Sequence, residues 1–377
     1  MQNKHKNLYM IPNNYLSLFF TMRGPVSVLA FFKKYVLQAG GKVILMIPLL
    51  FFVLSASACR TSLKSSAVDY RGEMRKFVVS IARAARLSSP SFAVIPQNGQ
   101  ELIERADKDA DISAVGELDG SDIESYMDAV SGTGREDLYF GYEDDDKATP
   151  EAVSSYMKNF CDAFRAAGKK VFVIDYCSAP SSVDFSYAQN YKNGYISFAA
   201  DERNLTSIPL YPGAPFNENG DAVLTVADAK NFLYLINPER FSSKEDFIAA
   251  LCKTNYDMFI VDLFCADEKL DFSDVQRLKV KPNGARRQVI CYMSIGEAET
   301  YRYYWNESWK RSKPEWLKKE NQLWKGNYKV AYWHPEWQNI IFGTEDSYLQ
   351  KILDVGFDGV YLDIVDAFEY FENGEKE

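Results

Sequence analysis

The chain has 377 residues and a net charge of −9, and no basic block stands after residue 59. This balance excludes nucleic acid as an expected partner and favours neutral or cationic ligands. After residue 59 the chain contains a single histidine, His334. Zinc sites built on histidine pairs and Ser-His-Asp catalysis are therefore excluded in that part, and no metal or organic cofactor is expected.

Residues 1–59 are predicted to be a leader that is separate from the folded body. An apolar run at 43–58 follows Lys42 and ends in small residues directly before Cys59. This run is shorter than the roughly 20 residues of a spanning helix and fits a secretory signal. We expect export across the inner membrane and lipidation of Cys59, which would anchor the protein to a membrane of the bacterial cell envelope. Simple secretion and a retained anchor are the alternatives.

After the leader, short apolar runs alternate with helical patterns, as in proteins built from βα units. The pattern predicts helices at 67–87, 152–167, 243–253 and 347–355. It predicts strands at 92–95, within 127–139, and at 170–176, 194–199, 232–236, 256–264, 288–295, 328–333 and 360–362. The Pro-, Gly- and Asn-rich segment 201–230 is predicted to be a linker. A (β/α)8 barrel has eight strand places, so one run is surplus, and 194–199 is our candidate.

The last predicted strand carries the clearest sign of chemistry. Asp363 and Asp366 follow the buried run 360–362, where such a strand opens onto a loop. In (β/α) barrels, carboxylates at the carboxyl ends of strands usually belong to the active site. Only seven residues follow Tyr370. The later strands of such a barrel must therefore come from another part of the chain.

Several long motifs resemble glycoside hydrolase family 114, the endo-α-1,4-polygalactosaminidases and related secreted bacterial proteins with a TIM-barrel fold. The motifs CYMSIGEAETYRYYW (291–305), YWHPEW (332–337) and GFDGVYLDIVDAFEYF (356–371) resemble the front half of that barrel. The motifs FAVIPQNGQEL (92–102), GTGREDLYF (132–140) and KKVFVIDY (169–176) resemble its back half. The back half therefore comes first in this chain.

The resemblance implies an α/β protein with a circularly permuted (β/α)8 TIM barrel. Residues 67–200 would form the back part, 201–230 the joint between the old termini, and 231–377 the front part. Such a permutation is physically reasonable because the last strand of a closed barrel pairs with the first. We expect a monomer. Two half-barrels that complement each other between protomers, and a misassembled reading frame, are the alternatives.

The resemblance also implies a pair of catalytic carboxyl groups, Glu136 as general acid and Asp363 as nucleophile or charge stabiliser. Glycoside hydrolysis usually uses one protonated and one ionised carboxyl. A solvated loop acid is the alternative for Glu136, and a structural turn acid is the alternative for Asp363. Asp137 and Asp366 are the close substitutes for these roles.

Further side chains are expected to bind the substrate around this pair. These candidates are Asn98, Asp175, Tyr176, Asp262, Tyr292, Glu299, Arg302, Tyr332, Trp333 and Asp366. For Glu299 and Arg302 a salt bridge that stabilises the loop is an equal alternative, and Asn98 can be a turn residue. Any single aspartate at a strand end can instead be a structural hydrogen-bonding group.

Converging carboxylates match a cationic amino-sugar polymer, so we expect hydrolysis of a galactosamine-type polysaccharide. The alternative is a carbohydrate-binding or scaffold protein that keeps the barrel without the activity. Deacetylation is disfavoured, because the His-rich metal site that it would use is missing from the sequence after residue 59.

Overall fold

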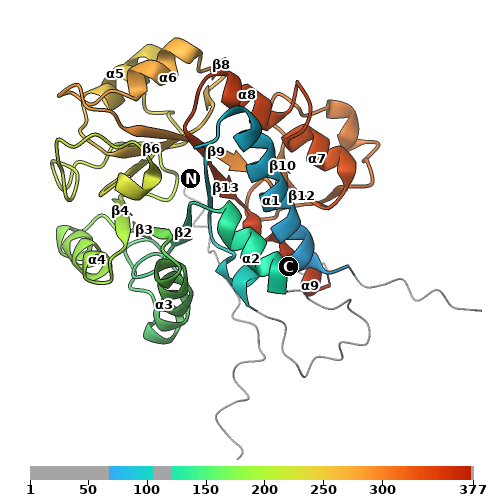
Figure 1. The fold of residues 1–377 in the computed structure, drawn as a ribbon, viewed down its shortest axis with the longest axis horizontal. Helices are drawn as coiled ribbons and strands as arrows, with labels where there is room; N and C mark the ends of the chain where they lie inside the picture. Colours follow the sequence, from blue (N-terminus) through green and yellow to red (C-terminus); the bar gives the residue numbers. More distant parts are fainter. Residues whose placement is uncertain (1–67, 105–119, 375–377) are drawn as a thin grey trace, which may run out of the picture. The chain divides into compact units, whose positions relative to one another are not determined.

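The computed structural model describes residues 68–104 and 120–374. Within these ranges the protein is a mixed α/β structure with parallel sheets (Figure 1). The parallel strands are β1 (Ala93–Pro96), β2 (Gly132–Glu136), β3 (Lys170–Tyr176), β4 (Ile196–Ala200), β5 (Leu233–Tyr234), β6 (Met258–Val261), β9 (Gln288–Ser294) and β13 (Gly359–Asp363).

The parallel strands form two ladders that meet at β1 and β2. One sheet has the order β1-β13-β9-β6-β5 and the other has the order β2-β3-β4. A parallel bridge between Gln97 and Gly134 joins β1 to β2, and β4 contacts β5. The ladder between β13 and β1 pairs Gly359 with Ala93, so the end of the described chain lies beside its beginning.

Helices are interspersed with the strands along the chain. They are α1 (Tyr70–Ser88), α2 (Gly120–Ala129), α3 (Glu151–Ala166), α4 (Pro180–Lys192), α5 (Lys244–Cys252), α6 (Phe272–Leu278), α7 (Pro335–Ile341), α8 (Tyr348–Asp354) and α9 (Phe368–Glu372). Figure 1 shows α1 and α2 side by side on one flank of β13. One hydrophobic core cluster runs through the helices and the parallel strands.

Several short strands and 3-10 turns lie outside the parallel strands. The small strands are β7 (Phe264–Cys265), β8 (Glu268–Lys269), β10 (Glu297–Glu299), β11 (Leu317–Glu320) and β12 (Asn327–Val330). The 3-10 turns are η2 (Gln100–Ile103), η4 (Val226–Asp228), η5 (Glu307–Lys310) and η6 (Val365–Ala367).

The predicted helices at 67–87, 243–253 and 347–355 correspond to α1, α5 and α8, and each has a recognisable first turn. The side chains of Asp69, Ser243 and Ser347 accept hydrogen bonds from the backbone N–H groups of Gly72, Asp246 and Gln350. Such caps satisfy N–H groups that a helix leaves unpaired. The helix at 152–167 corresponds to α3.

Our choice of the surplus strand was wrong. Residues 196–200 form β4 and pair in parallel with β3, whereas 327–330 form β12, which pairs antiparallel with β10 and β11. Both runs are short and apolar, so periodicity alone could not separate a strand of a parallel sheet from one in a side sheet.

The predicted linker 201–230 contains no strand and, as its only helical turn, η4. The predicted leader, with Cys59, lies outside the described residues. No helix in the described ranges has the length and apolar character needed to cross a membrane.

Candidate functional site

The amide of Gln97 joins the two predicted catalytic carboxyls. Its Nε2 atom donates to Glu136 Oε2 at 2.8 Å and to Asp363 Oδ1 at 3.0 Å. Gln97 directly follows β1, Glu136 ends β2 and Asp363 ends β13, and these strands are neighbours. The parallel pairing thus brings residues from distant parts of the sequence to the same end of the strands.

Each carboxyl has further hydrogen-bond donors of its own. Glu136 accepts hydrogen bonds from Asn98 Nδ2 at 2.9 Å and from the Tyr176 hydroxyl. Asp363 accepts from the Tyr292 hydroxyl at 2.6 Å and from the Ile364 backbone N–H at 2.8 Å. Donors of this kind fix the positions of both carboxyls.

The geometry around Gln97 depends on two local features of the chain. Tyr234 on β5 donates its hydroxyl to Gln97 Oε1 at 3.1 Å, which turns the amide N–H groups toward the carboxyls. Asn98 has a φ of 57°, a left-handed conformation that asparagine adopts more readily than most residues. In this turn its Oδ1 accepts the backbone N–H of Glu136 at 3.2 Å.

Close packing of β2 requires glycine next to the pair. A Cβ atom on Gly134 would lie 1.9 Å from the Tyr361 hydroxyl oxygen. The sequence Gly-Thr-Gly-Arg-Glu is a weak strand former on its own, since glycine gains little from strand packing. Its place between β1 and β3 gives this segment its strand conformation.

The two carboxyls influence each other's ionisation. Burial, and then the charge of Glu136, raise the pKa of Asp363 to about 8. Asp363 therefore holds its proton at a higher pH than an ordinary aspartate does. Glycosidases use such a shift to keep one carboxyl protonated at neutral pH.

A buried ion pair lies behind Glu136. Arg203 Nη2 donates to Asp137 Oδ1 at 2.9 Å and to the Gly141 carbonyl at 2.7 Å. The guanidinium also lies 3.9 Å from the centre of the Tyr176 ring, whose hydroxyl holds Glu136. Burial raises the pKa of Asp137 to about 7 although Arg203 opposes this shift. Asp137 is thus part of the support for the pair, since Arg203 occupies its carboxylate.

More carboxyls lie near one side of the pair. Burial raises the pKa of Asp366 to about 6, opposed by Lys329 and reinforced by Glu101 and Glu136. Burial and Asp366 raise the pKa of Glu369 to about 8. This side of the site is therefore acidic.

Asp175 does not point toward the pair, contrary to our expectation for its strand end. Its side chain is fully buried and accepts hydrogen bonds from the Tyr139 and Phe140 backbone and from Ser186 and Asn190 on α4. Neighbouring residues of a strand face opposite sides. Because Tyr176 reaches Glu136, Asp175 must face the helices.

Asp262, Glu299 and Arg302 bind one another, as the salt-bridge alternative predicted. Arg302 contacts both carboxylate oxygens of Asp262 at 2.8 Å and Glu299 Oε2 at 2.5 Å. All three side chains are less than 10% exposed. Because these side chains are buried and paired with one another, none of them presents a free charge to a sugar.

Tyr332 and Trp333 are likewise separate from the pair. Tyr332 is fully buried and donates its hydroxyl to the Tyr70 carbonyl at 2.7 Å. Trp333 packs on Phe371 and Tyr70, with ring centres 4.7 and 5.1 Å apart. The two rings attach α1 and α9 to the segment after β12. Tyr332 is therefore not accessible to a substrate, whereas the role of the half-buried Trp333 in substrate binding stays a prediction.

The sequence did not predict three residues of the site, Gln97, Tyr234 and Arg203. Gln97 adjoins Asn98, and sequence alone does not tell which of two neighbouring amides faces inward. Tyr234 lies in an apolar run that is typical of core. Arg203 lies in the segment that we predicted to be a linker. Within the described ranges no group of three or more His, Cys, Asp or Glu side chains is placed to hold a metal ion.

The raised pKa of Asp363 predicts a specific dependence of stability on pH. An unfolded aspartate titrates near about 3.9, and Asp363 in the folded protein titrates near about 8. Between these values the folded state binds more protons, so this group reduces the stability as pH rises through the window. We compare the free energy of unfolding of Asp363→Asn with that of the wild type. We expect this difference to favour the variant more at pH 9 than at pH 4, by on the order of 2 kcal/mol.

Urea unfolding at a series of pH values measures this effect. The exposed Glu239 serves as control, and Glu239→Gln should change the stability little at any pH. A constant difference between Asp363→Asn and the wild type from pH 4 to 9 would contradict the raised pKa.

Two carboxyls at the ends of neighbouring parallel strands are compatible with a glycosidase, because glycoside hydrolysis usually uses a pair of carboxyl groups. Comparison with known proteins agrees with this class. Residues 228–376 match the model of glycoside-hydrolase family GH114, and this match supports membership of that family. Membership supports glycosidase activity. The match includes Asp363, whereas Gln97 and Glu136 lie outside it.

The similar curated proteins are uncharacterized. One from Methanocaldococcus jannaschii is 46% identical over 133 residues, which is 34% of this chain and 36% of the relative. One from Thermotoga maritima is 51% identical over 82 residues, 22% of this chain and 24% of the relative. One from Deinococcus radiodurans is 42% identical over 95 residues, 25% of this chain and 30% of the relative. The chain thus spans about a third or less of the length of each.

Proposed function

We propose that this protein hydrolyses glycosidic bonds in an amino-sugar polysaccharide of the galactosamine type. The observation that carries the proposal is the single Gln97 amide that holds both carboxyls, Glu136 and Asp363. A structural salt bridge does not explain this arrangement, since neither acid has a basic partner among the ion pairs of the described residues. An acid whose pKa is raised by burial and by a second acid is costly for stability and is typical of catalytic sites.

In the proposed mechanism Glu136 is the acid and Asp363 the nucleophile. Asp363 attacks the anomeric carbon while Glu136 gives its proton to the departing glycosidic oxygen. Glu136 then removes a proton from a water molecule, which hydrolyses the ester formed on Asp363. The hydrogen bonds from Tyr292 and Ile364 stabilise the carboxylate of Asp363 when it is released.

The spacing of the pair favours retention of configuration. Both oxygens lie within hydrogen-bond distance of one nitrogen, at 2.8 and 3.0 Å, so they can be no farther apart than the sum of these distances. Retaining enzymes have carboxyls roughly 5–5.5 Å apart, and inverting enzymes need roughly 6.5–9.5 Å to admit a water molecule. We therefore assign the retaining mechanism.

We also propose that the parallel strands close a permuted (β/α)8 barrel, with 67–200 as its back part, 201–230 as the joint and 231–377 as its front part. The ladder of β13 with β1, the bridge between β1 and β2, and the contact of β4 with β5 support a closed ring. Arg71 and Glu372 also form an ion pair at 3.0 Å, next to stacked Tyr70 and Phe371. The two ends of the described chain are thus neighbours.

The acidic side of the site supports a cationic substrate. Asp366 and Glu369 are half-buried carboxyls, Asp366 interacts with Glu136 and Glu369 with Asp366, and the chain as a whole has a net charge of −9. An ammonium group on a deacetylated sugar would be attracted there. We retain the expectation of a monomer that is exported and lipid-anchored through Cys59.

A panel of polymers tests the proposed activity. Purified protein is incubated with partly deacetylated poly-galactosamine, fully acetylated poly-galactosamine, chitosan and a neutral glucan, and new reducing ends are counted. We expect release from the partly deacetylated galactosamine polymer at the highest rate. If no polymer in the panel yields reducing ends, the proposed function is wrong.

Arg203 provides a further prediction for the same reaction. Its cation lies against Tyr176 and is electrostatically coupled to Glu136, so it favours the ionised form of the pair. Replacing it by methionine removes this charge, and we expect kcat to fall about tenfold with little change in KM. Since the carboxyls then ionise less readily, the acidic limb of the kcat/KM profile should move to higher pH.

The matched control is Arg240→Met, because Arg240 forms an exposed ion pair with Glu202 in the neighbouring loop. This variant should keep the wild-type pH profile. Arg203→Met combined with Asp137→Asn removes the unpaired buried carboxylate, so it separates loss of stability from loss of positioning. An unshifted acidic limb in both Arg203 variants would show that Arg203 does not act on the pair.

A further inference from the structure

A cavity lies at the opposite ends of the strands, away from the carboxyl pair. It has a volume of about 370 Å³, within the range of roughly 300–1,000 Å³ that is typical of small-molecule sites. Its walls come from the loop 208–218, from 253–256 before β6, and from 282–283 before β9. The site of Glu136 and Asp363 is instead at the carboxyl ends of its strands, so the two places are distinct.

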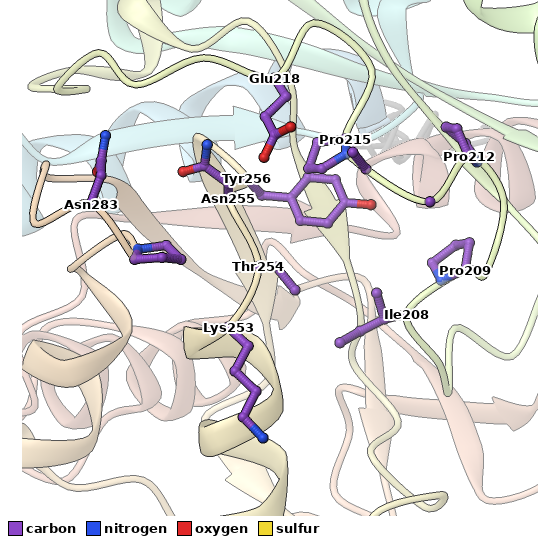
Figure 2. Close-up of a pocket in the computed structure, with 13 residues that line it drawn as sticks. Ile208, Pro209, Pro212, Pro215, Glu218, Lys253, Thr254, Asn255, Tyr256 and Asn283 are labelled. Carbon is purple, nitrogen blue, oxygen red and sulfur yellow. The ribbon is translucent and has the colours of Figure 1, made fainter.

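Polar side chains line this cavity. Tyr256 is only 7% exposed and is part of the lining. Figure 2 shows its hydroxyl directed toward the side of Pro209 and Pro212. Asn255 also lines the cavity, and its buried Oδ1 has no hydrogen-bond partner among the described residues. Unpartnered polar groups in a cavity are expected to meet a ligand or solvent, because burying them unsatisfied is costly.

The cavity is held in shape by the groups behind it. Asn255 Nδ2 donates to the Asn219 carbonyl at 3.1 Å, and Asn219 Nδ2 donates to Asp257 at 3.0 Å. Asp257 forms a fully buried ion pair with Lys281 at 2.5 Å. The proline rings of the wall also restrict the backbone. A preformed cavity loses little conformational entropy when a ligand binds to it.

The lining fits a short, polyhydroxylated ligand. Proline rings offer apolar faces, while Tyr256, Asn255 and Asn283 offer neutral donors and acceptors. Glu218 is exposed at the rim and makes no ion pair with any described residue, so it can accept from hydroxyl or ammonium groups. Lys253 is the only cation of the lining, which disfavours a polyanionic ligand.

We propose that this cavity is a second saccharide-binding site, which takes one or two units of an amino-sugar chain and holds the polymer apart from the place of cleavage. The choice of sugar rests on the proposed function, whereas the presence of a site does not. Binding here would raise the local concentration of polymer around the protein.

Calorimetric titration of Asp363→Asn, which is expected to bind without turnover, tests this proposal. The probes are trisaccharides of galactosamine and of N-acetylgalactosamine. We expect two binding sites per chain, and a loss of about tenfold or more in affinity at one of them in the variant that also carries Tyr256→Phe and Glu218→Ala. Tyr211→Phe is the matched control, since it removes a hydroxyl from the same loop outside the cavity lining.

Each outcome bears on the proposal. A single site, or two sites that the Tyr256→Phe and Glu218→Ala changes leave unaffected, would overturn it. If the double variant unfolds, Tyr256→Phe alone keeps the packing of the ring and gives the same comparison. Wild-type protein that releases no sugar but shows the Tyr256-dependent site would refute the proposed function and support this inference.

Discussion

Replacing Asp363 by asparagine or Glu136 by glutamine is expected to lower kcat by about 10³-fold or more on a galactosamine polymer. Each change removes one of the two carboxyls that contact the Gln97 amide, while the new amide keeps the shape of the side chain. Acid catalysis alone contributes roughly 10²–10⁴-fold, and loss of a nucleophile costs at least as much. Initial rates of reducing-end release, with thermal unfolding to confirm the fold, measure the effect.

Binding of an oligosaccharide should persist in both variants, with a dissociation constant within a few-fold of the wild type. Glu239→Gln, an exposed exchange of the same kind, should keep full activity. Turnover that survives both substitutions would show that Glu136 and Asp363 are not the catalytic pair. No turnover in the wild type, with oligosaccharide binding kept in all three proteins, would support the rival function, a carbohydrate-binding or scaffold protein on the same fold.

Chemical rescue shows which residue of the pair is the nucleophile and which is the general acid. In Asp363→Ala, azide should attack the anomeric carbon from the vacated side and give a glycosyl azide of inverted configuration. In Glu136→Ala, azide should attack the glycosyl-enzyme and give the retained configuration. The opposite pattern would exchange the roles of Glu136 and Asp363.

The second large effect concerns stability. Replacing Arg302 by methionine leaves the carboxylates of Asp262 and Glu299 buried without their cation. Breaking a buried pair by removing one partner costs about 3–5 kcal/mol, and here two acids lose the same partner. We therefore expect a loss of free energy of unfolding at the upper end of this range, measured by urea denaturation at pH 7.

The control for this change is Arg277→Met. Arg277 forms a bidentate ion pair with Glu245 at 2.6 and 2.7 Å, but both side chains are exposed to solvent. Surface pairs contribute about 0–1 kcal/mol, so this variant should unfold almost like the wild type. Equal stability of Arg302→Met and the wild type, together with a raised KM, would restore the sugar-binding interpretation of Arg302.

The sequence predicted the elements with strong patterns and the strand ends that carry chemistry. The helices α1, α5 and α8 have regular apolar spacing and capping side chains, so they were predictable to within a few residues. The strands with β-branched and aromatic runs, such as β3 and β9, were equally clear. The proximity of β13 and β1 was inferred from a family resemblance and could not be derived from local pattern.

What the sequence could not predict depends on the direction of side chains. Asp175 and Tyr176 are neighbours, yet only Tyr176 reaches Glu136, because a strand turns successive residues to opposite sides. For the same reason, the sequence did not show that Gln97 contacts the carboxyl pair as well as its neighbour Asn98. Arg203 was missed for another reason, since a loop without periodicity gives no sign of which side chain folds back onto the sheet.

The anomeric configuration of the first product reports how Glu136 and Asp363 work together. A galactosamine oligomer is cleaved in deuterated buffer and followed by proton NMR before mutarotation mixes the anomers. The close spacing of Glu136 and Asp363 across Gln97 predicts that the new reducing end keeps the configuration of the bond that was cleaved. An inverted first product, or no product at all, would contradict the account.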